Sequence, residues 1–163
     1  MPTYLLQVKA DLEGVDSLTP KVGNQWKLDV QNDAAEVREG ITVSSSDEYE
    51  LEGSRGRANF VMRFNKGDQQ SYLKLEKLVP KKHGDGVVTA AKSGCWVTVA
   101  VLEARGIEPI KFHRSLDFDV KSSGEKLCVF DDADFAEGDW ADYDADADIS
   151  VTVSNIEYRV VKE

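Results

Sequence analysis

Alternating apolar and polar residues run through most of the chain. In residues 3–12 nearly every second side chain is apolar, which is the period of a strand with one buried face. The same period, or a short run of β-branched and aromatic residues, predicts further strands at 26–31, 41–43, 60–62, 71–78, 96–104, 127–130 and 149–161. Helical signals are nearly absent, apart from a turn or two within 139–146. The predicted fold class is therefore all-β, or nearly so.

Glycine and proline divide these predicted strands into two series. Residues 15–25, with Pro20 and Gly23, are expected to form a loop, and the breaker-rich segment from Pro80 to Gly86 separates an N-terminal half from a C-terminal half. A chain of 163 residues fits one domain, or two small halves, with a sizeable core. We therefore predict a single domain over 1–163, with β-rich halves at 1–80 and 87–163.

The two halves show a weak internal repeat. Gly14 follows the first predicted strand and Gly106 follows the strand at 96–104. Each glycine is followed by Val or Ile, then directly by an acid, and two positions later by Leu or Ile. After similar gaps come Leu28-Asp29-Val30 and Phe118-Asp119-Val120. The pattern favours two halves of like topology, packed together and related by a pseudo-two-fold axis. Chance similarity of two strand-turn-strand units is the alternative.

The net charge is −10, and it is concentrated in one segment. Between Asp131 and Asp148 there are nine acids and no Lys or Arg. No basic stripe exists that could release counterions from a phosphate backbone, so nucleic acid is not an expected partner. The acidic segment is a candidate contact surface for a basic partner, with a solvated loop as the simpler alternative.

Composition and apolar patterning indicate a soluble protein. Hydrophobic residues make up 41% and charged residues 31% of the chain, and no apolar run approaches the roughly 20 residues of a membrane span. The N-terminal segment lacks a basic leader and alternates like a strand. We expect a cytoplasmic protein without membrane contact.

Candidate chemical groups are few. Cys95 and Cys128 are expected to be two reduced, buried thiols, with a disulfide as the alternative, and neither belongs to a C-x-x-C pair. His83 and His113 are expected to be exposed loop residues without a role. No nucleophile–base spacing is evident, so no catalytic residue is predicted.

Two other segments invite a binding interpretation. Alternating acids at 142–148 resemble part of an EF-hand loop, but a loop starting at 142 places Ala147 and Val153 where Gly and Glu are needed, and one starting at 144 places Ile149 and Asn155 there. The turn Gly53-Ser54-Arg55-Gly56 could present backbone N–H groups to an anion, but its glycines fit a tight hairpin turn better.

Three longer motifs resemble a known family. GSRGRANFVM, RGIEPIKF and FAEGDWADYDADADISV occur in the order and spacing of the eukaryotic CXXC motif-containing zinc-binding proteins, and the resemblance extends from Leu6 to the C-terminus. The resemblance implies a compact β-rich protein of two similar halves, with a zinc ion held by two C-x-x-C knuckles. It also implies no established enzyme activity, and a link to metal handling through a copper-chaperone partner.

The chain departs from the family at the zinc ligands. Counted without gaps from Trp26 and from Gly53, the four cysteines fall on Asn32, Ala35, Phe64 and Gly67. One neutral amide oxygen does not bind zinc in place of four thiolates. We therefore predict that the metal ligands are lost and that no cofactor is bound. Our hypothesis is that Phe64 fills the vacated centre, with Ala35 and Gly67 small enough to admit it.

These observations favour a non-enzymatic binding or scaffold protein, a metal-free relative of a zinc-binding family that acts through a protein partner. The alternative is a small-molecule-binding or hydrolytic enzyme with a site between the two halves.

Overall fold

A computed structural model describes residues 2–163, and nearly all of its regular structure is β. The strands are β1 (Thr3–Glu13), β2 (Val15–Pro20), β3 (Trp26–Gln31), β4 (Val37–Val43), β5 (Tyr49–Glu50), β6 (Arg57–Ala58), β7 (Phe60–Met62), β8 (Ser71–Glu76), β9 (Val88–Thr89), β10 (Val97–Arg105), β11 (Glu108–Phe112), β12 (Phe118–Ser122), β13 (Val129–Phe130), β14 (Trp140–Asp144) and β15 (Ile149–Lys162). Two short helices, α1 (Pro80–His83) and the 3-10 turn η1 (Ala90–Lys92), complete the fold. The predicted all-β class is confirmed.

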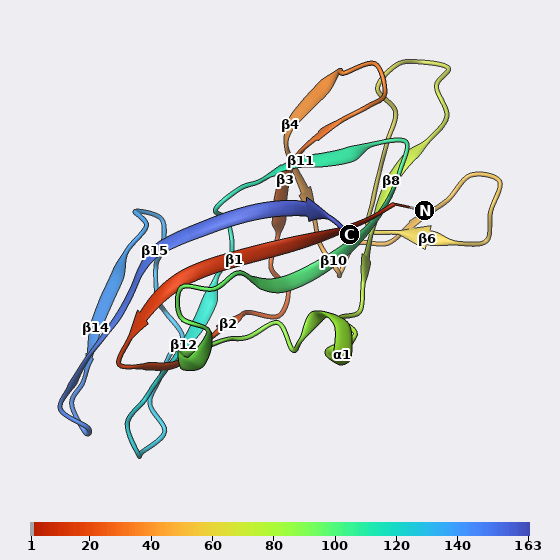
Figure 1. Cartoon of the computed structure of the whole chain (residues 1–163). Coiled ribbons are helices and arrows are strands. Elements are labelled where there is room, and N and C mark those ends of the chain that lie inside the picture. Colours follow the sequence, from red (N-terminus) through yellow and green to blue (C-terminus); the bar gives the residue numbers. More distant parts are fainter. Residues whose placement is uncertain (1) are drawn as a thin grey trace.

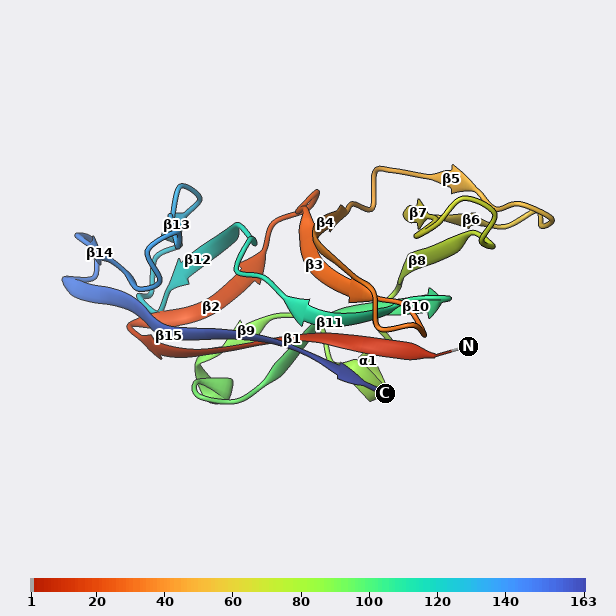
Figure 2. The same ribbon diagram turned by 90° about the horizontal axis from the view of Figure 1, so that it is seen from above.

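The long strands form one curved sheet that runs the length of the molecule (Figure 1). Its order is β14-β15-β1-β10-β8-β7, with every pair antiparallel. Two smaller sheets, β11-β3-β4 and β13-β12-β2-β9, stand side by side on one face of it (Figure 2). The segment that carries α1 lies toward the opposite face, and β5 and β6 form a separate hairpin.

The strand pairing has a pseudo-two-fold relation between the halves. Exchanging β1 with β10, β8 with β15, and β7 with β14 reproduces the order of the large sheet. The same operation exchanges β2 with β11, β3 with β12 and β4 with β13, which maps the pairing β11-β3-β4 onto β2-β12-β13. The predicted repeat is confirmed, and 28–30 and 118–120 lie on the equivalent strands β3 and β12.

The two glycines of the repeat occupy equivalent bends. Gly14, between β1 and β2, has φ +67°, and Gly106, between β10 and β11, has φ +77°. A Cβ on Gly14 would lie 2.2 Å from the Ser150 carbonyl oxygen, and one on Gly106 would lie 2.5 Å from Ser71 Oγ. The left-handed conformation and the close neighbouring strand both select glycine here.

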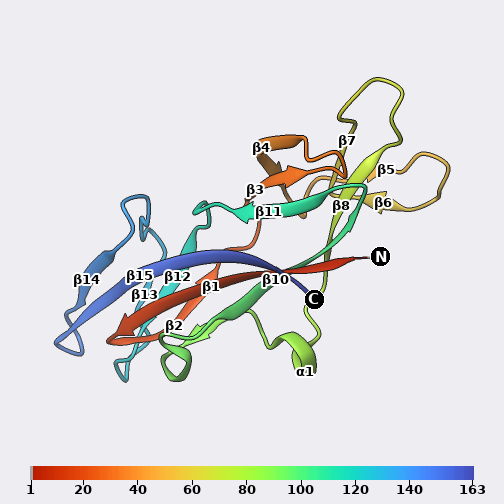
Figure 3. The ribbon, with the colours of Figure 1, turned by 45° about the horizontal axis from the view of Figure 1, so that its top comes forward.

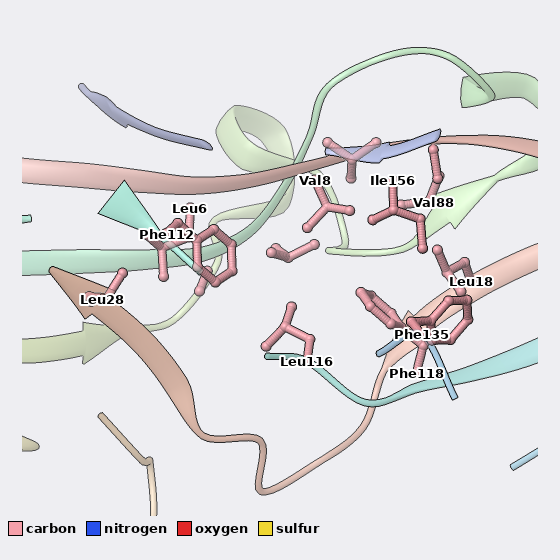
Figure 4. Packing of buried hydrophobic residues seen from close by; sticks show 14 of the residues in the cluster. Leu6, Val8, Leu18, Leu28, Val88, Phe112, Leu116, Phe118, Phe135 and Ile156 are labelled. Carbon is pink, nitrogen blue, oxygen red and sulfur yellow. The ribbon is translucent and has the colours of Figure 1, made fainter. Parts of the chain in front are cut away.

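The core fills the space between the large sheet and the two small sheets, and it has two lobes. Phe112 and Leu28 lie in one lobe and Leu18 and Phe118 in the other, with Leu116 between them (Figure 4). Leu18, Leu28 and Phe118 are fully buried. Each small sheet contains strands from both halves, so the halves interleave and share one core.

Several elements differ from the sequence-based expectation, and the strands β5, β6, β9, β11 and β12 are absent from the predicted list. Residues 15–20, expected in a loop, form β2, because pairing with β12 stabilises a strand despite the polar Asp16 and Ser17. Residues 140–144, expected at most as helical turns, form the edge strand β14 against β15. β4 begins at Val37 rather than at 41, and β13 is limited to Val129–Phe130. Tertiary pairing overrode weak local signals in each case.

Within residues 2–163, no helix has the length and apolar character needed to cross a membrane.

Candidate functional site

The two turns at the family's zinc-knuckle positions lie side by side. One turn joins β3 to β4 and carries Asn32 and Ala35, and the other joins β7 to β8 and carries Phe64 and Gly67. Both contribute to the lining of one hollow of about 460 Å³, which Asn32 and Phe64 share. Figure 3 shows these turns at one end of the molecule, near the β5–β6 hairpin. The tertiary structure thus brings the two predicted segments together.

Each turn is first closed by a local polar side chain. Asn32 Oδ1 accepts hydrogen bonds from the backbone N–H groups of Ala34 (3.1 Å) and Glu36 (2.9 Å). Asp68 Oδ2 accepts one from the backbone N–H of Asn65 (3.1 Å). Short polar side chains that bond to nearby backbone groups are typical of turns. The turns therefore keep a defined shape through their own polar groups.

A single carboxylate then joins the two turns. Glu36 Oε1 accepts hydrogen bonds from the side-chain amides of Asn32 (3.1 Å), in its own turn, and Asn65 (3.0 Å), in the opposite turn. These two bonds hold the pKa of Glu36 below its usual value, because they stabilise the charged form. We call Asn32, Glu36 and Asn65 the carboxylate bridge.

The predicted role of Phe64 is only partly seen. Phe64 is half-buried, packs against the edge of the core, and carries the Arg38 guanidinium 5.5 Å from its ring centroid. Ala35 and Gly67 are exposed, and a Cβ on Gly67 would meet nothing within 4 Å. Both small residues face solvent, so the structure does not show them making room for Phe64.

The side chains at this site do not fit a zinc ion. Phe64, Ala35 and Gly67 offer no donor atom, and the Asn32 oxygen is occupied by two backbone N–H groups. Across residues 2–163, no three His, Cys, Asp or Glu side chains are grouped so that they could hold a metal ion. Zinc in proteins is ligated by thiolate, imidazole and carboxylate groups in a tetrahedral set. The side chains at the four predicted positions do not provide such a set of ligands.

The pseudo-two-fold relation places an equivalent pair of turns in the second half. These are the β12–β13 and β14–β15 turns, and a carboxylate joins them as well. Ser122 Oγ donates to Asp144 Oδ2 over 2.5 Å in a buried contact, and Asp144 Oδ1 accepts from the Ala147 N–H (3.2 Å). The Ser122 bond holds the pKa of Asp144 below its usual value, although burial opposes this. Both halves therefore close their turns with an aspartate or glutamate.

The histidines are not the exposed, unpartnered residues that were expected. His113 Nε2 lies 2.6 Å from Asp29 Oδ1, which also accepts from the Gly40 N–H (2.8 Å). Burial raises the pKa of Asp29, but these hydrogen bonds outweigh it and the net pKa is lowered. No hydroxyl or thiol hydrogen-bonds to the His113 ring within residues 2–163, so His113 orients β11 against β3 rather than a nucleophile.

The second histidine fastens the C-terminus. The side chain of His83 is only 5% exposed, and its Nδ1 accepts from the Val79 N–H (3.0 Å). The proton therefore resides on Nε2, which donates to Glu163 (2.7 Å), while Lys82 binds the other carboxylate oxygen (2.9 Å). The prediction of an exposed loop residue was wrong because the C-terminal strand covers the ring.

Of the remaining candidates, both thiols are free, as predicted, but they are not buried: Cys95 is exposed and Cys128 is half-buried. The acidic run lies on the β13–β15 side of the molecule, at the far end from the zinc-knuckle turns (Figure 3). The GSRG segment is the tip of the β5–β6 hairpin, closed by Leu51 N–H to Gly56 O (3.1 Å). The segment therefore forms the tight hairpin turn that was favoured from the sequence.

Sequence reasoning missed the two residues that complete the bridge, Glu36 and Asn65. Asn32-x-x-x-Glu36 and Asn65-x-x-Asp68 each carry the signal of a polar turn. Only the tertiary structure shows that the two turns meet and that Glu36 of one turn binds Asn65 of the other.

Comparison with known sequences identifies the family to which the chain belongs. A sequence model described as "CXXC motif containing zinc binding protein, eukaryotic" matches residues 5–161. The chain belongs to this family. The bovine (Bos taurus) CXXC motif containing zinc binding protein is 29% identical over 161 residues, which cover 96% of each chain. UPF0587 protein C2D10.03c of Schizosaccharomyces pombe is 26% identical over 99% of each chain.

Solved structures show the same architecture. A hypothetical protein from Plasmodium falciparum superposes with a TM-score of 0.87 at 26% identity, covering 99% of this chain and 100% of its own. The crystal structure of C1orf123 gives a TM-score of 0.84 at 25% identity, with 99% of each chain covered. This chain therefore has the same fold as these structures, although its sequence contains no C-x-x-C pair.

Proposed function

We propose that this chain is a metal-free member of the family that works as a non-enzymatic binding protein in the cytoplasm, through a protein partner. The carboxylate bridge carries the proposal, because it joins the two knuckle turns through amide donors and one carboxylate. Thiolates and imidazoles are absent from both turns. The turns keep their place in the fold without the ligands that a zinc ion requires.

The absence of an assembled catalytic set supports a binding role. Strongly perturbed groups at enzyme sites gather around a pocket. Here the carboxylates with lowered pKa lie in different parts of the fold, and each has a structural partner: Asp29, Glu36, Glu52, Asp144 and Glu163. A partner of the family's metal-handling kind, such as a copper chaperone, would then be recognised by surface contacts.

Metal content is the direct test of the metal-free part. Protein purified without chelator is expected to contain well under one zinc per chain by elemental analysis, and its Tm is expected to be unchanged by EDTA. A zinc-binding member of the family, produced in the same way, serves as the positive control. Stoichiometric zinc, or a Tm that falls in EDTA, would overturn this part.

The binding part needs a separate measurement. Immobilised chain is expected to retain a defined protein from cell extract, in EDTA as well as without it, and cross-linking should map contacts to one face. Turnover of a substrate in a broad hydrolase screen, together with no retained protein, would favour the enzyme alternative instead.

A further inference from the structure

Three hollows meet at one residue beside the zinc-knuckle turns. Their volumes are about 620, 460 and 500 Å³, and Arg105 is the single residue that lines all three. The first two also share Asn32, Asp33 and Gly106, and the last two share Gln69 and Gln70. Together they form one continuous groove, which we call the Arg105 groove, from Pro2 to the GSRG turn.

The fold fixes the backbone of Arg105 but leaves its charge without a partner. Arg105 ends β10, opposite Tyr72 of β8, and the next residue is the tightly packed Gly106. Its side chain is exposed and makes no hydrogen bond or ion pair with any residue of 2–163. Lys162, in the same 620 Å³ hollow, is likewise exposed and without such a partner.

The carboxylates around the groove are largely engaged with other groups. Glu108 accepts from the Gln31 amide (3.0 Å) and lies 3.5 Å from the Tyr4 hydroxyl, and Glu52 is paired with Arg63. Glu36 accepts from the side-chain amides of Asn32 and Asn65, and Asp68 accepts from the Asn65 N–H. Asp33 is the exposed exception, and it lines the first two hollows together with Arg105. The groove thus offers a free guanidinium among five lining carboxylates, four of which already have partners.

Neutral amide side chains line the rest of the groove. Gln31 and Asn32 lie on one side of Arg105, and Gln69 and Gln70 lie on the other. Amide groups can donate to carbonyl oxygens and accept from N–H groups. Asn32 and the Gln31 amide nitrogen are engaged within the fold, and Gln70 Oε1 accepts from the Glu52 N–H (3.1 Å). The Gln69 amide, Gln31 Oε1 and the Gln70 amide nitrogen remain able to pair with the backbone of an extended peptide.

We propose that the Arg105 groove binds an extended peptide segment of a protein partner, and that Arg105 holds an Asp or Glu carboxylate of that segment in a bidentate pair. This inference rests on the proposed function, since it names the surface and the chemistry by which the protein partner is recognised. Guanidinium and carboxylate match in two parallel N–H···O bonds, which add direction to the charge attraction.

A peptide fits these features better than a small free anion does. The groove is open and elongated, and its volume is divided among three adjoining hollows, whereas small ligands favour one enclosed cavity. A doubly charged phosphate would also meet Asp33 and Glu108 with only two cations to offset them. A single carboxylate with neutral flanking peptide bonds meets less of that repulsion, because it carries half the charge.

A random peptide library displayed on phage, panned against the full chain, tests the proposal. Enriched sequences are expected to share one Asp or Glu position. A soluble peptide from that set should lose about tenfold or more in affinity when this acid is replaced by its amide, and equally when the chain carries Arg105→Gln. Arg105→Lys should recover only part of the loss.

The matched control is Arg55→Gln, which removes an exposed arginine outside the three hollows and should leave the affinity unchanged. Chemical shifts of backbone amides establish that each variant is folded. Enrichment without a shared acid, no enrichment, equal binding to Arg105→Gln, or equal competition by glutarate alone would overturn the proposal. If a partner is captured from extract by wild type and Arg105→Gln alike, the proposed function stands and this site fails.

Discussion

At the scale of single residues, the Glu36 carboxylate joins the two turns at which the zinc ligands of the family were predicted to fall. A structural zinc can contribute about 10 kcal/mol or more to folding, far beyond the net contribution of two hydrogen bonds in contact with water. Glu36 is exposed, so solvent screens its interactions further. The bridge therefore sets the mutual position of the turns, while the sheets behind them supply most of the stability.

Replacing Glu36 by alanine tests this role. The Glu36→Ala variant is expected to have a lower Tm at pH 7, because two amide donors lose their acceptor. The folded pKa of Glu36 lies below its ordinary value of 4.5, so its contribution is present above that pH and is lost as the pH falls further. The Tm difference from wild type should therefore shrink below pH 4.5.

Glu39→Ala is the matched control, since Glu39 is exposed on the neighbouring β4 and has no hydrogen bond or ion pair with the rest of residues 2–163. Equal Tm values for the two variants across this pH range would contradict the bridge.

At the scale of elements, the pseudo-two-fold relation depends on two sharp bends. β1 and β10 each leave the large sheet at a glycine, and β2 and β11 then enter the small sheets. At these points the neighbouring strand approaches so closely that a side chain would displace it. At either bend a side chain would clash with the neighbouring strand and force an L-residue into the left-handed region. This is the physical reason why both halves carry glycine there.

Alanine at the bend glycines is expected to destabilise the protein in a defined order. Gly14→Ala adds a Cβ against the backbone of Ser150, which cannot move alone, so we expect a loss of about 3–4 kcal/mol. Gly106→Ala meets the Ser71 side chain, which can rotate, so we expect about 2–3 kcal/mol.

Gly53→Ala provides the control for backbone strain alone. Its φ is +68°, but no atom lies within 4 Å of the added Cβ, so the expected cost is about 1 kcal/mol. Urea unfolding measures all three values, and a cost for Gly14→Ala no larger than that for Gly53→Ala would contradict the packing argument.

At the scale of the whole molecule, the two ends differ in character. The Arg105 groove and the zinc-knuckle turns lie at one end, and the acidic run lies at the other (Figure 3). The six-stranded sheet connects the two ends, so both surfaces belong to one continuous framework. Because the two turns lie side by side, the predicted loss of the metal site would be a loss of ligands and not of the framework that would hold them.

Restoring the ligands should therefore restore the metal. A variant with Asn32→Cys, Ala35→Cys, Phe64→Cys and Gly67→Cys is expected to bind one zinc per chain, and cobalt should give the visible absorption of a tetrahedral thiolate site. The control with only Asn32→Cys and Ala35→Cys has half the ligands and should bind far more weakly. A folded four-cysteine variant that binds no metal would show that the turns do not face one another as described.

Much of the fold was predictable because strand periodicity is a local property. The alternation in β1 and β15, the break before the second half, and the glycine repeat all lie in short stretches of sequence. β2 and β14 were not predictable in this way, since Asp16, Ser17 and the acids of 142–144 favour loops until a partner strand pairs with them.

The sequence by itself determined the β class, the two-fold repeat, the family and the absence of any C-x-x-C pair, because each depends on which residue occupies which position. The tertiary structure alone decided that Glu36 reaches Asn65, that both histidines have carboxylate partners, and that Arg105 stands where three hollows meet. These contacts join residues far apart in the chain, so their existence depends on the packing of sheets and not on local pattern.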